Sequence, residues 1–273
     1  MPELPEVETT RRHLLSHIVG RTLTQVTIHA GAERLAITHA PRELELELTG
    51  RRIEVLDRHG KYLLASLDDG RTWVIHLRMS GSLVIAPPSE PPHVYERARV
   101  SFDDGTLMRF NDLRKFGTWH LVEDSREAMP NAGPDALSHE FSPQWLRGQL
   151  KRRTIAVKSA LLDQKIAAGV GNIYADEACF IARIDPRTPA DQVGSRRATR
   201  LHGAIIEALQ RSLDDGGTSF STYLNGLGQQ GTHVMNVHVF RREGERCDRC
   251  GGTIQKLRVG GRGTHFCAGC QRR

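Results

Sequence analysis

The chain has 273 residues, enough for two compact domains, and its hydrophobic content of 38% is sufficient for real cores. The net charge of +6 lies entirely in the last 33 residues, where nine Lys/Arg face three Asp/Glu, while the remainder carries 29 of each. No apolar run approaches the length of a membrane span and the first residues are not a signal peptide, so the composition excludes a membrane protein and favours a cytoplasmic one. A basic terminal module on a neutral body predicts a polyanionic partner, most simply nucleic acid.

The first eight residues, Met-Pro-Glu-Leu-Pro-Glu-Val-Glu, combine two prolines with three carboxylates. If Met1 is removed, Pro2 becomes a free secondary amine, which can attack an aldehyde carbon as lysine amines do in Schiff-base enzymes. The resulting iminium is positively charged without a proton, and Glu3 would be the nearest carboxylate for moving protons. The structural alternative is a stiff arm leading into a helix, where proline is common. Taken alone, these residues favour the arm.

The next part of the chain reads mainly as strands. A helix is predicted over residues 6–17 and a strand over 22–28. Residues 42–48 are ambiguous, because leucines alternate with Glu as in a strand, whereas Pro41 could open a short helix. Further strands are predicted at residues 52–58, 62–67, 73–77, 82–85, 97–102, 107–111 and 118–122. Short strands separated by Asp-Asp-Gly and Pro-Pro turns are typical of an antiparallel sandwich or barrel.

The chain changes character between residues 123 and 135, where periodicity is lost and a domain boundary is predicted. Helices are then predicted at residues 143–151, 155–163, 172–182 and 196–214. Gly169-Val-Gly-Asn places two glycines before a helix that could begin at Asn172, and helix N-termini offer N–H donors to phosphates. On its own this pattern is more often a tight turn. A glycine-rich polar loop over 216–231 is expected to be mobile and to serve recognition.

Four of the five cysteines form the pattern Cys247-x2-Cys250-x16-Cys267-x2-Cys270. This spacing predicts a tetrahedral zinc site with four thiolate ligands, and the metal should be structural because no coordination position is left open. Disulfides are not expected in a chain without a secretion signal. The glycines between the cysteine pairs indicate a zinc-ribbon hairpin. Cys179 lies in an apolar stretch and is predicted to be buried.

Three loop tips carry unusual side chains. Lys61 lies at a turn between two strands, where lysine is usually a solvated charge but could face a phosphate or a leaving group. Met79 lies at a Ser-Gly turn, and Phe116 follows Arg114 and Lys115. An exposed apolar side chain beside cations can wedge into a base stack. Each tip alone is better explained by surface or core roles, but together with the basic zinc module they make DNA the simplest partner. No P-loop, nucleophile elbow or His-Glu-x-x-His motif is present.

These motifs occur in a familiar order. Met1-Pro-Glu-Leu-Pro-Glu-Val-Glu-Thr, Lys61-Tyr-Leu-Leu, Met79-Ser-Gly-Ser-Leu, Arg114-Lys-Phe-Gly, Gly169-Val-Gly-Asn-Ile-Tyr-Ala and the cysteine tail resemble the bacterial formamidopyrimidine-DNA glycosylases along the whole chain. The resemblance implies an α+β fold with an N-terminal antiparallel β-sandwich and flanking helices, a helix–two-turn–helix domain, and a zinc-ribbon β-hairpin, with DNA in the cleft. The implied domains are 1–130, 131–225, a connecting segment 226–240 and a zinc finger 241–273.

The resemblance also implies an activity, namely excision of 8-oxoguanine and formamidopyrimidines from duplex DNA followed by β,δ-elimination at the abasic site. Pro2 would be the nucleophile at C1′, Glu3 the general acid/base, and Lys61 a proton donor and phosphate contact. Glu6 would hold the reactive terminus. One structural zinc ion and no organic cofactor are implied, in a monomer acting at the nucleoid.

The remaining assignments concern DNA. Met79, Arg114 and Phe116 would fill the gap left by the everted nucleotide, with Arg114 facing the orphaned cytosine. The residues implied to bind phosphates beside the lesion are Lys158, Asn172 and Arg262.

Three departures from the family pattern leave the lesion preference open. Lys115 stands where a second Arg is frequent, and Leu113 where Pro is common. His238-Val-Phe-Arg-Arg-Glu replaces the more usual Val-Tyr-Gly-Arg before the finger, and the loop over 218–233 does not align. One alternative is the sister endonuclease VIII class, which acts on oxidised pyrimidines, but its N-terminus usually reads Pro-Glu-Gly-Pro and Leu4 argues against it. The other alternative is a non-catalytic damage-binding protein, which would not need Pro2, Glu3 and Lys61 together.

Overall fold

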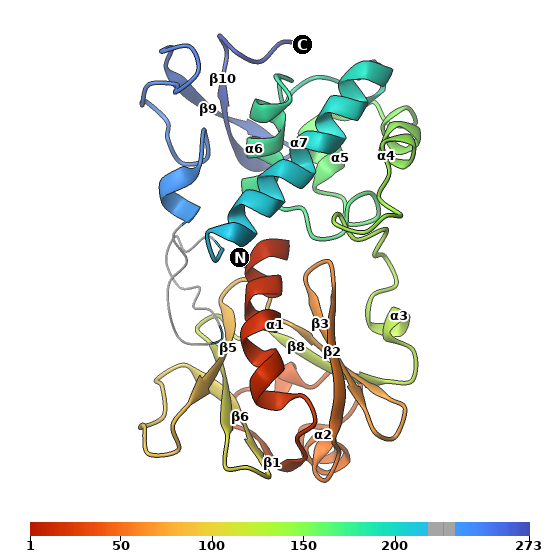
Figure 1. The fold of residues 1–273 in the computed structure, drawn as a ribbon, viewed down its shortest axis with the longest axis vertical. Coiled ribbons are helices and arrows are strands. Elements are labelled where there is room, and N and C mark those ends of the chain that lie inside the picture. Colours follow the sequence, from red (N-terminus) through yellow and green to blue (C-terminus); the bar gives the residue numbers. More distant parts are fainter. Residues whose placement is uncertain (218–225, 227–232) are drawn as a thin grey trace. The chain divides into compact units, whose positions relative to one another are not determined.

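The computed structural model describes residues 1–217, 226 and 233–273, which divide into two compact units (Figure 1). Unit 1 comprises Met1–Pro130 and Asp215–Val234, and unit 2 comprises Asn131–Asp214 and Met235–Arg273. The division after Pro130 falls within the predicted boundary region. Most of the expected recognition loop lies outside the described residues. Among the helices of the described ranges, none has the length and apolarity of a transmembrane segment.

Unit 1 is built on two four-stranded antiparallel sheets, which confirms the predicted antiparallel sandwich. One sheet has the order β1-β6-β7-β5, formed by β1 (Leu23–Ile28), β6 (Glu96–Phe102), β7 (Leu107–Asp112) and β5 (Gly81–Ala86). The other has the order β2-β3-β4-β8, formed by β2 (Ile53–His59), β3 (Tyr62–Leu67), β4 (Thr72–His76) and β8 (Thr118–Val122).

The core of unit 1 lies between these sheets and the long helix α1 (Leu4–Ile18), which packs against β2, β3 and β5. Trp73 and Trp119 meet edge-to-face with their ring centroids 4.8 Å apart, and both are fully buried. Such aromatic pairs add to the free energy gained from apolar burial. The core therefore fixes α1, and the predicted nucleophile Pro2 lies just before this helix begins.

The ambiguous segment is a helix, α2 (Pro41–Leu48). Pro41 occupies the first helical turn, where its missing N–H has no partner to lose. Leu44 and Leu48, four residues apart, are fully buried, while Leu46 is 60% exposed. Leu44 and Leu48 therefore share one buried helical face, and the exposed Leu46 between them does not belong to it. A short helix, α3 (Ser125–Ala128), follows β8 and was not predicted.

Unit 2 holds four further helices, α4 (Pro143–Leu150), α5 (Val157–Leu161), α6 (Asn172–Ile181) and α7 (Ser195–Asp214). Its hairpin consists of β9 (Ile254–Val259) and β10 (Arg262–Cys267). Helix α5 is shorter than predicted, because Ala156 is extended and bridges to Pro189. Helix α6 packs against both α7 and β10, so it is the element on which the hairpin is mounted. Short 3-10 turns occur at Glu33–Leu35, Ala190–Gln192 and His233–Asn236.

Candidate catalytic and DNA-binding sites

The first turn of α1 holds the chain terminus in a fixed, buried position. Pro2 is buried, and Glu3 is the extended N-cap residue with 2% of its surface exposed. The Glu3 N–H donates to Oε2 of Glu6 at 2.7 Å, and Glu6 is itself only 1% exposed. An acidic residue in this turn also interacts favourably with the helix dipole. Met1, in contrast, is half exposed, so the residue that must be removed lies at the protein surface.

The turn that leads to Lys61 is tied to α1 by buried charges. Glu8 accepts from Arg58 of β2 at 3.1 Å, and both side chains are 9% exposed. Arg58 also donates to the carbonyl of Gly60 at 3.0 Å. Burial acts to raise the pKa of Glu8, but hydrogen bonds and charges from three arginines outweigh it and lower this pKa to about 2. Lys61 is 6% exposed, so the interpretation as a solvated surface charge is wrong.

A neutral histidine lies between Lys61 and the Met79 turn. His76 ends β4 and meets the ring of Tyr62 edge-on at 4.4 Å. Burial, followed by the charges of Arg78, Lys61 and His120, lowers its pKa to about 3. Its Nδ1 accepts from the Arg78 N–H at 2.8 Å, so the remaining ring proton is on Nε2. His76 therefore holds the backbone immediately before Met79.

The two predicted intercalating tips are hydrogen-bonded to each other through Asp112. Its Oδ2 accepts from the N–H groups of Phe116 and Gly117, both at 2.8 Å. Its Oδ1 accepts from the Arg114 N–H at 3.1 Å and from the hydroxyl of Ser80. Asp112 is 1% exposed, so these donors have little competition from water. One buried carboxylate thus shapes the tip at 114–117 and fastens it to the Met79 turn.

The side chains that the sequence singled out at these tips are exposed, and Leu113 beside them is 45% exposed as well. Met79 is 39% and Phe116 46% exposed. The guanidinium of Arg114 lies over the Phe116 ring, 4.9 Å from its centroid. Gly117 is required for close packing, since a Cβ there would lie 2.3 Å from the Phe110 ring. Unit 1 therefore presents a methionine, a phenylalanine and an arginine on a rigid base.

In unit 2, the side chain of Asn172 reaches the hairpin beside Arg262. Helix α6 begins at Asn172, after Gly169 in the left-handed region and Gly171 as N-cap, so the glycine pattern does precede a helix N-terminus. The hairpin turn at Gly260–Gly261 has positive φ at both residues, as a two-residue turn of this kind needs. The side-chain amide of Asn172 donates to the Gly263 carbonyl at 3.2 Å, next to the exposed Arg262.

Lys158 does not fit its predicted role as a direct phosphate contact. Its side chain has no exposed surface, and Nζ pairs with Oδ1 of Asp176 at 2.7 Å. Nζ also donates to the Gly263 carbonyl and to the Thr264 hydroxyl, each at 2.8 Å. The ammonium is thus neutralised and hydrogen-bonded inside the protein, because a buried lysine is stable only with such partners.

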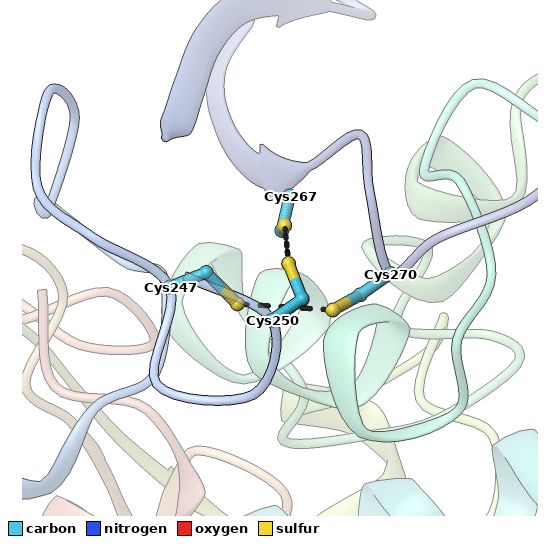
Figure 2. Close-up of side chains that lie close together, drawn as sticks. All are labelled: Cys247, Cys250, Cys267 and Cys270. Carbon is cyan, nitrogen blue, oxygen red and sulfur yellow. Dashed lines mark hydrogen bonds between the residues drawn. The ribbon is translucent and has the colours of Figure 1, made fainter. Parts of the chain in front are cut away.

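The four cysteines of the tail converge on one point (Figure 2). Their sulfur atoms lie within 4.8 Å of one another, with Cys247 and Cys270 at 3.7 Å and Cys250 and Cys267 at 3.5 Å. A zinc ion with Zn–S bonds of about 2.3 Å holds sulfurs at about this separation. The site binds one structural zinc. Cys179 is fully buried, as predicted, and burial keeps the pKa of its thiol far above the ordinary range.

Several residues that build these sites escaped the sequence-based prediction. Ser80 and Asp112 shape the tips, and Asp176 anchors the hairpin. Glu177 is equally important, since its carboxylate accepts the N–H groups of residues 238, 239 and 240 at 2.8 to 2.9 Å. An Asp at the end of a strand before a tight turn is a usable signal for an anchored turn. The two acids of α6 give no such local signal.

Comparison with known proteins gives the family. Residues 1–119 match the formamidopyrimidine-DNA glycosylase N-terminal domain, residues 132–223 the H2TH domain of the same enzymes, and residues 244–273 a zinc finger found in FPG and IleRS. The chain belongs to the formamidopyrimidine-DNA glycosylase family. It is therefore a DNA glycosylase and abasic-site lyase of base-excision repair.

Individual relatives agree over the full length. A formamidopyrimidine-DNA glycosylase of Symbiobacterium thermophilum is 44% identical and covers 99% of this chain and 89% of its own. That of Halalkalibacterium halodurans is 42% identical over the whole of both chains. The solved complex of Lactococcus lactis Fpg with abasic-site DNA has a TM-score of 0.90 at 36% identity and covers 99% of this chain and 100% of that one. The same protein solved with DNA containing FAPY-dG gives the same TM-score.

Proposed function

We propose that this chain removes oxidised purines, 8-oxoguanine and formamidopyrimidines, from double-stranded DNA, with the amine of Pro2 as nucleophile. The observation that carries the proposal is the buried first turn of α1, where Glu6 fixes the backbone of Glu3 directly beside Pro2. The solved Lactococcus lactis complexes, which contain abasic-site and FAPY-dG DNA, support the same lesions. A cytoplasmic monomer remains our prediction.

The chemistry begins at the nitrogen of Pro2 once Met1 has been removed. Its lone pair forms a bond to C1′, and the base leaves with the electrons of the glycosidic bond and takes up a proton. The nitrogen then loses its proton and the C1′–O4′ bond opens. O4′ takes up a proton, and an iminium remains between the nitrogen and C1′. Glu3 is the carboxylate placed to carry these protons, a role that geometry decides before pKa. The damaged base must first leave the stack.

The iminium then directs strand cleavage. It withdraws electrons from C2′, so a proton there can be removed while the bond from C3′ to its phosphate breaks. Loss of the 5′ phosphate follows in the same way. Lys61, a buried cation near the start of β3, is proposed to bind a phosphate and to donate protons. Met79, Arg114 and Phe116 are proposed to occupy the gap in the duplex, which apolar side chains can do at the cost of unstacking.

Borohydride trapping tests the proposal directly. Protein is incubated with duplex DNA carrying 8-oxoguanine opposite cytosine, and borohydride reduces any iminium to a stable covalent adduct. We expect the adduct at the N-terminal peptide by mass spectrometry. Pro2→Gly leaves a primary amine at the same terminus and should trap more weakly, whereas exposed Pro88→Gly should trap like the wild type. An adduct on any other peptide would show that another amine is the nucleophile.

The same assay distinguishes the proposed activity from that of an endonuclease VIII-like glycosylase for oxidised pyrimidines. A duplex carrying an oxidised pyrimidine such as thymine glycol replaces the 8-oxoguanine duplex. An adduct with that duplex only would overturn the purine assignment and leave the Pro2 chemistry intact. Binding of either duplex without any adduct would favour the non-catalytic alternative.

A further inference from the structure

We propose that Lys158 and Asp176 form a positioning pair that places Arg262 for phosphate binding, and that Lys158 itself does not contact DNA. The proposal rests on the proposed function, since it takes Asn172 and Arg262 as phosphate-binding residues. The family resemblance implies that Lys158 contacts a phosphate directly. The proposal gives Lys158 an indirect role instead.

The ammonium of Lys158 is enclosed by protein groups and is not open to a phosphate. It donates to the Gly263 carbonyl and to the Thr264 hydroxyl, each at 2.8 Å. Its ion-pair partner, Oδ1 of Asp176, lies 2.7 Å from Nζ. Both charged side chains of the pair are 0% exposed. A phosphate could reach Nζ only by displacing one of these groups and opening the packing between α5 and β10.

The groups that Lys158 holds flank Arg262. The Gly263 carbonyl, which accepts from Lys158, also accepts from the side chain of Asn172 at 3.2 Å. The Thr264 hydroxyl, which accepts from Lys158 in turn, donates to the carbonyl of Arg262 at 3.1 Å. One buried cation therefore connects the backbone of Arg262 to Asn172 at the start of α6.

Asp176 completes this arrangement from the other side. Its Oδ2 accepts from the N–H of His265 at 2.9 Å, so three consecutive residues of β10 are held by two side chains of α5 and α6. The hairpin turn is also close to α5, because a Cβ at Gly260 would lie 2.5 Å from the Ser159 hydroxyl. Zinc folds the opposite end of the hairpin, at Cys267, and does not by itself set the turn that carries Arg262.

A pair with a purely stabilising role would also explain the burial, and this alternative makes a different prediction. Buried ion pairs can often be replaced by apolar residues without loss of stability. A stabilising pair would change the melting temperature and leave phosphate contacts unchanged. A positioning pair changes the number of phosphates the protein neutralises, which the salt dependence of binding reports.

The test measures the affinity of the zinc-loaded protein for a duplex with a tetrahydrofuran abasic analogue, between low and physiological salt. Each lost phosphate contact reduces the slope of log K against log salt by about 0.9. We expect Arg262→Ala and Lys158→Met each to reduce the slope by about this amount, with affinity losses on the order of tenfold. The double variant should reduce the slope no further than Arg262→Ala alone.

Two variants that remove no positive charge sharpen the test. Asp176→Asn removes a negative charge, so a Lys158 that contacts DNA would bind as well or more tightly, whereas a positioning pair predicts weaker binding. Thr264→Val changes no charge at all, yet it should reduce the slope because the bond to the Arg262 carbonyl is lost. Exposed Lys256→Met in β9 removes the same charge as Lys158→Met and should have little effect.

The outcomes separate the hypotheses. A double variant whose slope falls by about 1.8 would overturn the proposal in favour of direct contact by Lys158. Unchanged slopes in Lys158→Met and Thr264→Val, with lowered melting temperature, would overturn it in favour of a stabilising role. If Lys158→Met does not fold, Thr264→Val and Asp176→Asn still decide. An unchanged slope in Arg262→Ala would show that Arg262 does not contact a phosphate. That result would leave the assignment of Pro2 untouched, because borohydride trapping tests the nucleophile separately.

Discussion

The two units fix their functional groups in different ways. In unit 1, buried carboxylates of the fold itself hold the working elements, with Glu6 on the terminus, Glu8 on the turn before Lys61, and Asp112 on both tips. Each group is held by its own set of hydrogen bonds, and one continuous hydrophobic core supports the unit. In unit 2, the hairpin that carries Arg262 depends on a metal at one end and one buried ion pair at the other.

This difference predicts different modes of failure. Loss of one anchor in unit 1 should disturb one loop and leave the sandwich folded, because the large hydrophobic core around Trp73 and Trp119 contains none of the anchoring carboxylates. The hairpin of unit 2 packs into a small core with Phe180 of α6, and two of the zinc ligands, Cys247 and Cys267, belong to this core. We therefore expect losses in unit 1 to be graded by site and losses at the zinc to remove a whole binding element.

Removal of the metal should have the largest effect. Zinc binding to structural sites of this kind contributes about 10 kcal/mol or more to folding of the finger. We expect Cys250→Ser to abolish zinc binding and to weaken DNA binding by about 100-fold or more, since every hairpin contact is lost. Metal analysis, and titration with the abasic-analogue duplex, measure the two effects.

The control for this variant lies in the other unit. Near-ultraviolet circular dichroism of the Trp73–Trp119 pair should be unchanged if unit 1 keeps its fold. Tight DNA binding by a zinc-free protein would contradict the comparison, because the hairpin would then be dispensable.

Loss of an anchor in unit 1 should have a smaller and more selective effect. Asp112→Asn leaves one acceptor oxygen and turns an amide toward N–H groups that the carboxylate accepted. An unsatisfied buried donor costs about 1–3 kcal/mol. We expect a corresponding drop in the free energy of unfolding, and a larger loss for excision of 8-oxoguanine than for cleavage at a preformed abasic site.

The selectivity of this loss is the point to measure. Excision requires the tips to open the stack, whereas a preformed abasic site lacks the base to be extruded. Single-turnover rates on the two duplexes give the ratio, and exposed Asp103→Asn at another turn serves as the matched control. Equal losses on both duplexes would indicate that Asp112 supports the sandwich and not the tips.

Local patterns explain how much could be predicted from the sequence. The cysteine spacing, the glycines before Asn172 and the alternation along the strands are features of short segments, and each produced the expected element. The pattern of segment 41–48 did not distinguish a helix from a strand. Leu44 and Leu48 fit the alternation of a strand, and they also lie four residues apart on one helical face.

The anchors escaped prediction because they join distant parts of the chain. Ser80 and Asp112 are 32 residues apart, and Lys158 and Thr264 are 106 residues apart. The sequence showed polar or charged residues at these positions and gave no sign of which would be buried. Lys158 is the clearest case, since a lysine in a DNA-binding protein is expected on the surface, whereas this one is neutralised inside.

The acid stability of unit 1 should show the smallest but most specific effect, through His76. The pKa of His76 is lowered from its ordinary 6.5 to about 3, first by burial and then by Arg78, Lys61 and His120. The folded state therefore prefers neutral His76, and its contribution to stability is fully present above pH 6.5. It is lost as the pH falls from 6.5 toward 3, because the unfolded chain binds a proton that the folded chain does not.

This loss can be separated from that of the carboxylates by pH range. The pKa of Glu8 is lowered from 4.5 to about 2, so its contribution falls only below pH 4.5. Burial also lowers the pKa values of His13 and His120, so the comparison of wild type with His76→Gln in denaturant unfolding is what isolates His76 between pH 6.5 and 5. The His76 contribution is a drop on the order of 2 kcal/mol, at about 1.4 kcal/mol per pH unit. His76→Gln should reduce the drop by this amount, because glutamine can still accept from the Arg78 N–H but does not titrate, and exposed His93→Gln should leave it unchanged. An undiminished slope in His76→Gln would place the titrating group elsewhere and leave the turn before Met79 without its neutral anchor.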